Sequence, residues 1–99
     1  MNKPVVYIFT DWYAPGFKAG GPIQSVVNLA QLLSKENRVK IITRNTDYGS
    51  QTPYLNLESD VWILGSENIE ILYISKENIT IKTFNNICKP GKQNIVIIN

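Results

Sequence analysis

A glycine-rich stretch between an apolar run and a helical pattern constrains the fold of this chain more than any other feature. The stretch covers residues 11–22 and places Gly20 and Gly21 directly before Pro22. The run before it, Val5–Phe9, is apolar throughout, which is typical of a strand buried on both faces of a parallel sheet. Proline suits the first position of a helix. The order of strand, glycine loop and helix N-terminus therefore predicts backbone N–H groups that can hold an anion such as a phosphate.

The segment after the glycine loop predicts a helix over residues 22–34 and a strand over residues 39–43. Apolar residues recur in the helix at offsets of three and four and give it one apolar face: Ile23, Val26, Val27, Ala30 and Leu33. With the first strand, these elements make a unit of about 40 residues, the length of a βαβ crossover. The rules for such connections place the start of the helix at the carboxyl edge of the sheet, where the parallel strands end.

A loop rich in turn-forming residues then spans residues 44–58 and leaves the same edge of the sheet. A loop of this length in a small domain is usually functional or mobile. Two strand candidates follow, at residues 61–64 and 70–74. They can form a hairpin, or the second can join the main sheet alone. We expect the second to join the sheet.

The last part of the chain predicts a weak helix over residues 79–88, ended by residues 89–92, and a final buried strand over residues 95–98. The predicted fold class is α/β, a Rossmann-like parallel sheet with flanking helices. Doubly wound sheets normally continue from such a strand into a loop and a covering helix. We therefore expect the chain to be part of a longer protein.

Composition excludes several classes of function. The 99 residues allow at most one small domain, and the net charge of +2 comes from scattered basic residues, so nucleic acid is not an expected partner. Histidine is absent and Cys88 is the single cysteine, so the sequence has no histidine-activated nucleophile, histidine metal ligand or internal disulfide. We predict no metal and no cofactor. Neither a signal-peptide core nor an apolar run of about 18 residues occurs, and we expect a cytoplasmic protein.

The glycine loop and the following helix contain a block of residues in a distinctive order: Tyr13, Pro15, Gly16, Lys18, Ala19, Gly20, Gly21 and Pro22, followed by Ser25, Asn28 and Leu29. This block resembles the N-terminal signature of bacterial retaining glycosyltransferases with the GT-B fold, of the glycosyltransferase family 4-like kind. Looser matches continue through residues 41–43, 47–50, 61–62 and 96–99. The resemblance covers nearly the whole chain, and the block around the glycines is its most specific part.

The resemblance implies two Rossmann-like domains that face each other across a cleft. Residues 1–99 would be part of the N-terminal, acceptor-side domain, and the C-terminal domain that binds most of the nucleotide-sugar donor would be absent. The parent enzyme would move a sugar to a glycan or lipid-linked acceptor in the synthesis of cell-surface polysaccharide or lipopolysaccharide. It would work in the cytoplasm, with peripheral contact at the inner face of the membrane. The chain alone is expected to be inactive, because the donor motif lies in the missing domain.

The glycine loop would contact the donor diphosphate through the amides of Gly20 and Gly21, the alternative being a tight turn without a ligand. Lys18 could pair with phosphate or remain a solvated loop charge. Candidates on the acceptor side are Asp11, Tyr13, Arg44 and Asp47. Asp11 could accept a hydrogen bond from an acceptor hydroxyl or cap the amides of its own loop, and Tyr13 could stack on a sugar or pack under the loop.

Two other functions remain open from the sequence. A dinucleotide-binding oxidoreductase or epimerase needs a G-x-G-x-x-G motif directly after the first strand. This chain instead has Gly16 and then Gly20 and Gly21 after a longer loop. A non-catalytic Rossmann-like binding module is the second alternative, since a fold of this kind does not fix a function.

Overall fold

A computed structural model describes residues 3–88 and 94–99 of the chain. In chain order the elements are β1 (Val5–Phe9), α1 (Gly21–Leu33), β2 (Arg38–Arg44), β3 (Trp62–Leu64), the 3₁₀ turn η1 (Ser66–Asn68), β4 (Glu70–Ile74), the 3₁₀ turn η2 (Lys76–Asn78), α2 (Ile81–Ile87) and β5 (Asn94–Ile98). In the part of the chain that is described, all five strands belong to one sheet, in the order β3-β4-β2-β1-β5. The predicted α/β class is confirmed.

The sheet is mostly parallel. β1 pairs in parallel with β2 on one side and β5 on the other, and β2 pairs in parallel with β4. β3 alone among the described strands runs antiparallel, against β4. The expectation that residues 70–74 join the main sheet is confirmed. The hairpin also forms, because β3 pairs with β4 in the same sheet, so residues 70–74 do not join the sheet alone.

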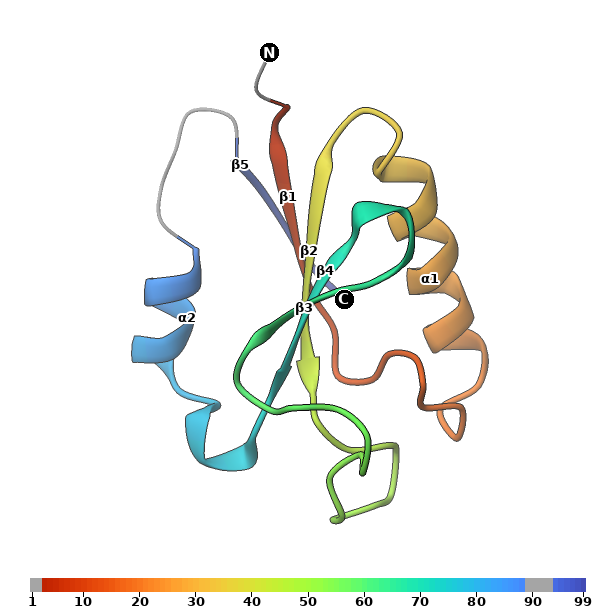
Figure 1. Ribbon diagram of the computed structural model, residues 1–99, viewed down its shortest axis with the longest axis vertical. Helices are drawn as coiled ribbons and strands as arrows, with labels where there is room; N and C mark the ends of the chain where they lie inside the picture. Colours follow the sequence, from red (N-terminus) through yellow and green to blue (C-terminus); the bar gives the residue numbers. More distant parts are fainter. Residues whose placement is uncertain (1–2, 89–93) are drawn as a thin grey trace.

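The two helices lie on opposite sides of the sheet (Figure 1). Alternate side chains of the central strands therefore enter two separate cores. Val6 and Ile8 of β1 belong to the core on the α1 side, together with Val26 and Ala30 of the helix. Tyr7 belongs to the core on the α2 side, with which several partly buried side chains pack: Val5, Phe9, Ile79, Phe84, Ile87 and Cys88. This confirms that β1 is buried on both faces.

Helix α1 agrees with the sequence pattern to within one residue at each end. Its buried residues, Ile23, Val26 and Ala30, lie on the predicted apolar face. Gly20 precedes the helix with φ of 72°, a backbone conformation that glycine adopts without steric cost. Helix α2 is shorter than predicted and begins after Thr80, whose hydroxyl accepts a hydrogen bond from the backbone N–H of Thr83.

The expectation that residues 95–98 form a buried strand is wrong in one respect. The strand forms, but Ile95, Val96 and Ile98 are 51%, 48% and 82% exposed. The reason is its place in the sheet, since β5 is an edge strand that pairs with β1 alone among the described strands. The predicted helix end at residues 89–92 lies outside the described residues. Within the described ranges, no helix is long and apolar enough to cross a membrane.

Candidate functional site

The glycine loop leaves β1 at the carboxyl edge of the sheet and is tied down by side chains from distant elements. The Tyr73 hydroxyl donates a hydrogen bond of 2.6 Å to the Ala14 carbonyl, and the Tyr54 hydroxyl donates one of 3.5 Å to the Tyr13 carbonyl. Burial, followed by the nearby Tyr13 and Tyr54, raises the pKa of Tyr73 to about 12. Tyr73 therefore remains a hydrogen-bond donor at physiological pH.

Gly16 is the glycine at which the loop approaches other groups most closely. A Cβ at this position would collide with the Tyr54 hydroxyl and would lie 2.8 Å from Asp47 Oδ1 and 3.0 Å from the Tyr13 carbonyl oxygen. The tight packing explains why this position needs glycine. In contrast, a Cβ built on Gly20 or Gly21 would meet nothing within 4 Å.

Asp47, from the loop after β2, occupies two backbone amides in the middle of the glycine loop. Its carboxylate accepts hydrogen bonds from the backbone N–H groups of Phe17 at 3.2 Å, Lys18 at 3.2 Å and Tyr48 at 2.8 Å. Partial burial raises the pKa of Asp47, but these N–H groups and the charge of Lys18 outweigh it and lower the pKa overall. The loop thus binds an anion that the chain itself supplies.

The end of the glycine loop next to α1 is more open. Gly20 and Gly21 are exposed, although the Gly20 N–H already donates a 3.0 Å hydrogen bond to the Phe17 carbonyl. No side chain caps the helix N-terminus, and the first turn holds no acidic residue. Lys18 is exposed on the same loop. Of the glycine loop, the segment at Gly20 and Gly21 is therefore the part where the backbone is accessible from outside, next to the positive end of the helix dipole.

Asp11 and Arg44 meet where β1 and β2 end. Arg44 Nε lies 3.1 Å from Asp11 Oδ1, and both side chains are about half exposed, at 45% and 56%. The Asp11 carbonyl accepts hydrogen bonds from the Arg44 N–H and the Thr43 hydroxyl. Asp11 therefore pairs with a cation, and it is Asp47 that caps the amides of the glycine loop.

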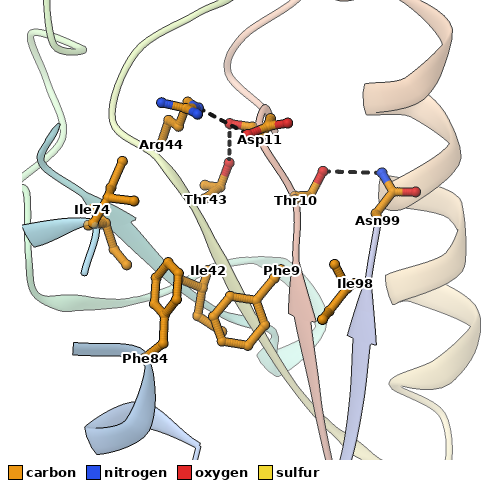
Figure 2. Close-up of a pocket in the computed structure, with 11 residues that line it drawn as sticks. Phe9, Thr10, Asp11, Ile42, Thr43, Arg44, Ile74, Phe84, Ile98 and Asn99 are labelled. Atoms are coloured by element: carbon orange, nitrogen blue, oxygen red, sulfur yellow. Dashed lines mark hydrogen bonds and ion pairs between the residues drawn. The ribbon is translucent and has the colours of Figure 1, made fainter. Parts of the chain in front are cut away.

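A cavity of about 300 Å³ opens beside this ion pair, on the α2 side of the sheet (Figure 2). Its apolar floor consists of Phe9, Ile42, Ile74, Ile79, Phe84 and Ile98. Its polar rim consists of Thr10, Asp11, Thr43, Arg44 and Asn99. Phe9 and Phe84 pack edge to face with centroids 5.1 Å apart, and Asn99 Nδ2 donates to the Thr10 hydroxyl at 3.3 Å. The crevice at the carboxyl ends of parallel strands is where open α/β sheets bind ligands.

A second cavity of about 350 Å³ adjoins the first, and the two share Arg44, Ile74 and Ile79 in their linings. The remaining lining is mostly polar and comes from the loop after β2 and from η2: Asn45, Thr46, Ser50, Gln51, Pro53, Lys76 and Glu77. The described part of the loop after β2 is also anchored to the sheet, because the Asn45 N–H donates to the Ile74 carbonyl at 3.1 Å.

The structure divides the residues selected from the sequence into two groups. Asp11 and Arg44 lie together at the first cavity, whereas Lys18, Gly20, Gly21 and Asp47 lie at the glycine loop. Tyr13 is 6% exposed and packs in the core on the α1 side, so of its two alternatives the packing role is the one realised.

Sequence reasoning missed several residues that line the cavities, above all Phe9, Thr43, Phe84 and Asn99. Thr43 ends one predicted strand and Asn99 directly follows another, both at the carboxyl edge, and this position was the available signal. Phe84 carried no such signal, because only the packing of α2 brings it to the same place.

Within residues 3–88 and 94–99, no group of three or more His, Cys, Asp or Glu side chains is arranged to hold a metal ion. Comparisons of the chain with protein-family models, curated proteins and solved structures found no match.

Proposed function

We propose that this chain is the N-terminal, acceptor-side part of a GT-B glycosyltransferase. The parent enzyme transfers a sugar, with retention, from a nucleotide-sugar donor to a glycan or lipid-linked acceptor in cell-surface polysaccharide synthesis. The observation that carries the proposal is the open space before Gly20 and Gly21 at an uncapped helix N-terminus. Because this block resembles the family signature, we assign the donor diphosphate as the ligand that binds there.

The chemistry of sugar transfer uses such a position. Breaking the sugar–phosphate bond builds negative charge on the departing diphosphate, and fixed N–H dipoles stabilise that charge without reorganising. The N–H of Gly20 is already bonded to Phe17, and the amides of Phe17 and Lys18 hold Asp47. The proposal therefore assigns the diphosphate to the Gly21 N–H, with the Lys18 ammonium as a second contact.

The acceptor belongs, in this proposal, to the cavity beside Asp11 and Arg44. This cavity lies at the same edge of the sheet as the glycine loop. Its lining includes Thr10 and Asp11, which directly follow the carboxyl end of β1, as the loop does. Donor and acceptor groups placed along one edge can face a second domain that closes over them, as the GT-B arrangement requires.

The test uses the product of the complete gene, because the proposal assigns most donor contacts to a further domain. Calorimetric titration with UDP-sugar, GDP-sugar and NAD should show binding of one sugar nucleotide and none of NAD. Tight binding of NAD together with failure of both sugar nucleotides would contradict the proposal and favour the dinucleotide-binding alternative.

A variant tests the contribution of the glycine loop to activity separately from that of the remainder of the enzyme. Gly21→Leu fills the open space and should lower sugar transfer by at least about tenfold, roughly 1.4 kcal/mol of transition-state stabilisation, while circular dichroism shows an intact fold. Leu32→Gln, at a position of the same helix that is 63% exposed and lies outside the signature block, is the control and should retain its activity. Equal activities of the two variants would remove the loop from the mechanism.

A further inference from the structure

The two adjoining cavities differ in the polarity of their linings, and this difference indicates what kind of ligand would fill both. In Figure 2 the labelled side chains divide into an apolar group, which includes Phe9, Ile42 and Phe84, and a polar group around Asp11 and Arg44. The second cavity continues from Arg44 into mostly polar surroundings. A ligand that fills both must have an apolar part, a polar part and a junction near the ion pair.

The ion pair at the junction favours an uncharged group that both donates and accepts hydrogen bonds. Arg44 contacts Asp11 Oδ1 through Nε at 3.1 Å. Among the described residues, no other side-chain hydrogen bond is found for the Arg44 terminal nitrogens or for Asp11 Oδ2, and both side chains are about half exposed. A hydroxyl can donate to the carboxylate and accept from the guanidinium at once. A free phosphate would meet the Asp11 charge, and an ammonium would meet the Arg44 charge.

The charges that line the two cavities together also favour an uncharged ligand. Among the described lining residues, Asp11 and Glu77 balance Arg44 and Lys76. The uncharged polar side chains of the second cavity carry hydroxyl and amide groups: Asn45, Thr46, Ser50 and Gln51. Groups of this kind suit the several hydroxyls of a sugar, each of which needs a partner when water is displaced.

A free sugar would not fill the first cavity well, because its hydroxyls would lie against phenylalanine and isoleucine side chains without partners. Leaving a buried hydroxyl unpaired is unfavourable, because its hydrogen bonds to water are not replaced. Burying an alkyl or aryl group there is favourable instead, because apolar surface is removed from water. The first cavity thus selects for the apolar part of the ligand and against a second sugar.

We propose that the joined cavities bind an amphipathic glycoside, with its alkyl or aryl group on the floor of the first cavity and its sugar in the second. A hydroxyl near the junction lies between Asp11 and Arg44. The identification of this ligand as the glycosyl acceptor rests on the proposed function and narrows that acceptor to a lipid-linked one. The binding itself follows from the lining alone.

The test is a titration of the ¹⁵N-labelled chain, followed by its amide NMR signals. The probes are n-octyl β-D-glucoside, kept below its critical micelle concentration, glucose, and sodium octyl sulfate. The glucoside should bind saturably and shift amides in both linings, such as those of Thr43 and Ser50. Glucose should leave the signals unchanged, and octyl sulfate should bind at least about tenfold more weakly, a difference of about 1.4 kcal/mol.

Two variants and two matched controls locate the site. Ile98→Asn alters an exposed residue of the floor, and Ile95→Asn is its control on the opposite face of β5. Arg44→Gln removes the guanidinium, and Arg38→Gln is its control at the other end of β2, where Arg38 pairs with Glu70 at 3.4 Å. Ile98→Asn and Arg44→Gln should each weaken glucoside binding by about tenfold, and the controls should bind as the parent chain does.

Three results would overturn the proposal. Equal affinity for octyl sulfate and octyl glucoside would mean that the floor is a nonspecific apolar patch. Binding of glucose as tight as that of the glucoside would mean that the apolar part contributes nothing. Absence of saturable binding would mean that no site exists. Glucoside binding by a complete protein that binds NAD and no sugar nucleotide would keep this inference and reject the glycosyltransferase.

Discussion

At the carboxyl edge of the sheet, the side that faces α1 is filled by the chain's own groups, whereas the side that faces α2 holds an open cavity. On the α1 side, the glycine loop is packed against Tyr54 and Tyr73, and Asp47 occupies the backbone amides of Phe17 and Lys18. On the α2 side, the polar residues at the ends of β1 and β2 line a cavity of about 300 Å³. One side has been closed by groups of the chain itself, and the other has been left open.

The difference shows that a conspicuous motif and an available site need not coincide. The glycine loop is the most unusual stretch of the sequence, yet Gly16 serves internal packing and only the Gly20–Gly21 end faces open space. The cavity is lined by ordinary residues that no motif marks. Its existence depends on where α2 packs and on the side chains that end each strand.

The largest effect on stability is expected for Gly16→Ala, which tests whether the glycine loop is closed by packing. The added Cβ would collide with Tyr54 and crowd Asp47, so we expect the free energy of unfolding to fall by about 2–3 kcal/mol, as in other overpacked sites. Urea denaturation at neutral pH measures the change. Gly21→Ala, which adds a Cβ in open space, should change stability by less than about 0.5 kcal/mol. Similar losses in both variants would mean that the two parts of the loop are packed alike.

Tyr73→Phe tests the anchor beneath the loop. It removes the donor to the Ala14 carbonyl and leaves that carbonyl short of a partner, so we expect a loss of about 1–2 kcal/mol in unfolding free energy. Tyr48→Phe, at a residue that is 52% exposed, is the matched control and should be nearly neutral. An unchanged stability of Tyr73→Phe would show that this hydrogen bond does not hold the loop.

Asp47→Asn should change how stability depends on pH. The pKa of Asp47 is lowered in the folded chain, so its stabilisation is complete above the unfolded pKa of about 3.9 and is lost as pH falls through the folded value. The parent chain should therefore melt above the variant at neutral pH, and the gap should shrink below about pH 4. Asp60, whose pKa is also lowered, is present in both proteins and cancels in the difference. A gap that stays constant with pH would exclude the carboxylate charge as its cause.

Arg44→Gln should have the smallest effect on stability. The Asp11–Arg44 pair is about half exposed, and such pairs contribute about 0–1 kcal/mol. Arg38→Gln, which breaks the exposed pair with Glu70, should give a similar value in the same denaturation experiment. A much larger loss for Arg44→Gln would mean that the open side is held together as tightly as the closed side.

The α/β class, the two ends of α1 and the first two strands followed from periodicity, because consecutive burial and offsets of three and four are local properties of the chain. The same reasoning placed Asp11 and Arg44 at one edge of the sheet, since both follow strands of a parallel pair. It could not choose the partner of Asp11, and it expected a buried β5 where an exposed edge strand is found. Strand order decides both, and strand order is a long-range property.

The sequence by itself determined that an apolar strand, a glycine loop and an amphipathic helix would follow one another at a carboxyl edge, because short-range sterics and hydrophobic periodicity act within a few residues. Only the tertiary structure decided that Asp47, 29 residues beyond Lys18, would satisfy the loop amides. It also decided that Phe84 and Asn99 would join Arg44 around a cavity. Contacts between distant residues depend on how the layers pack, and the local pattern of the chain does not encode that packing.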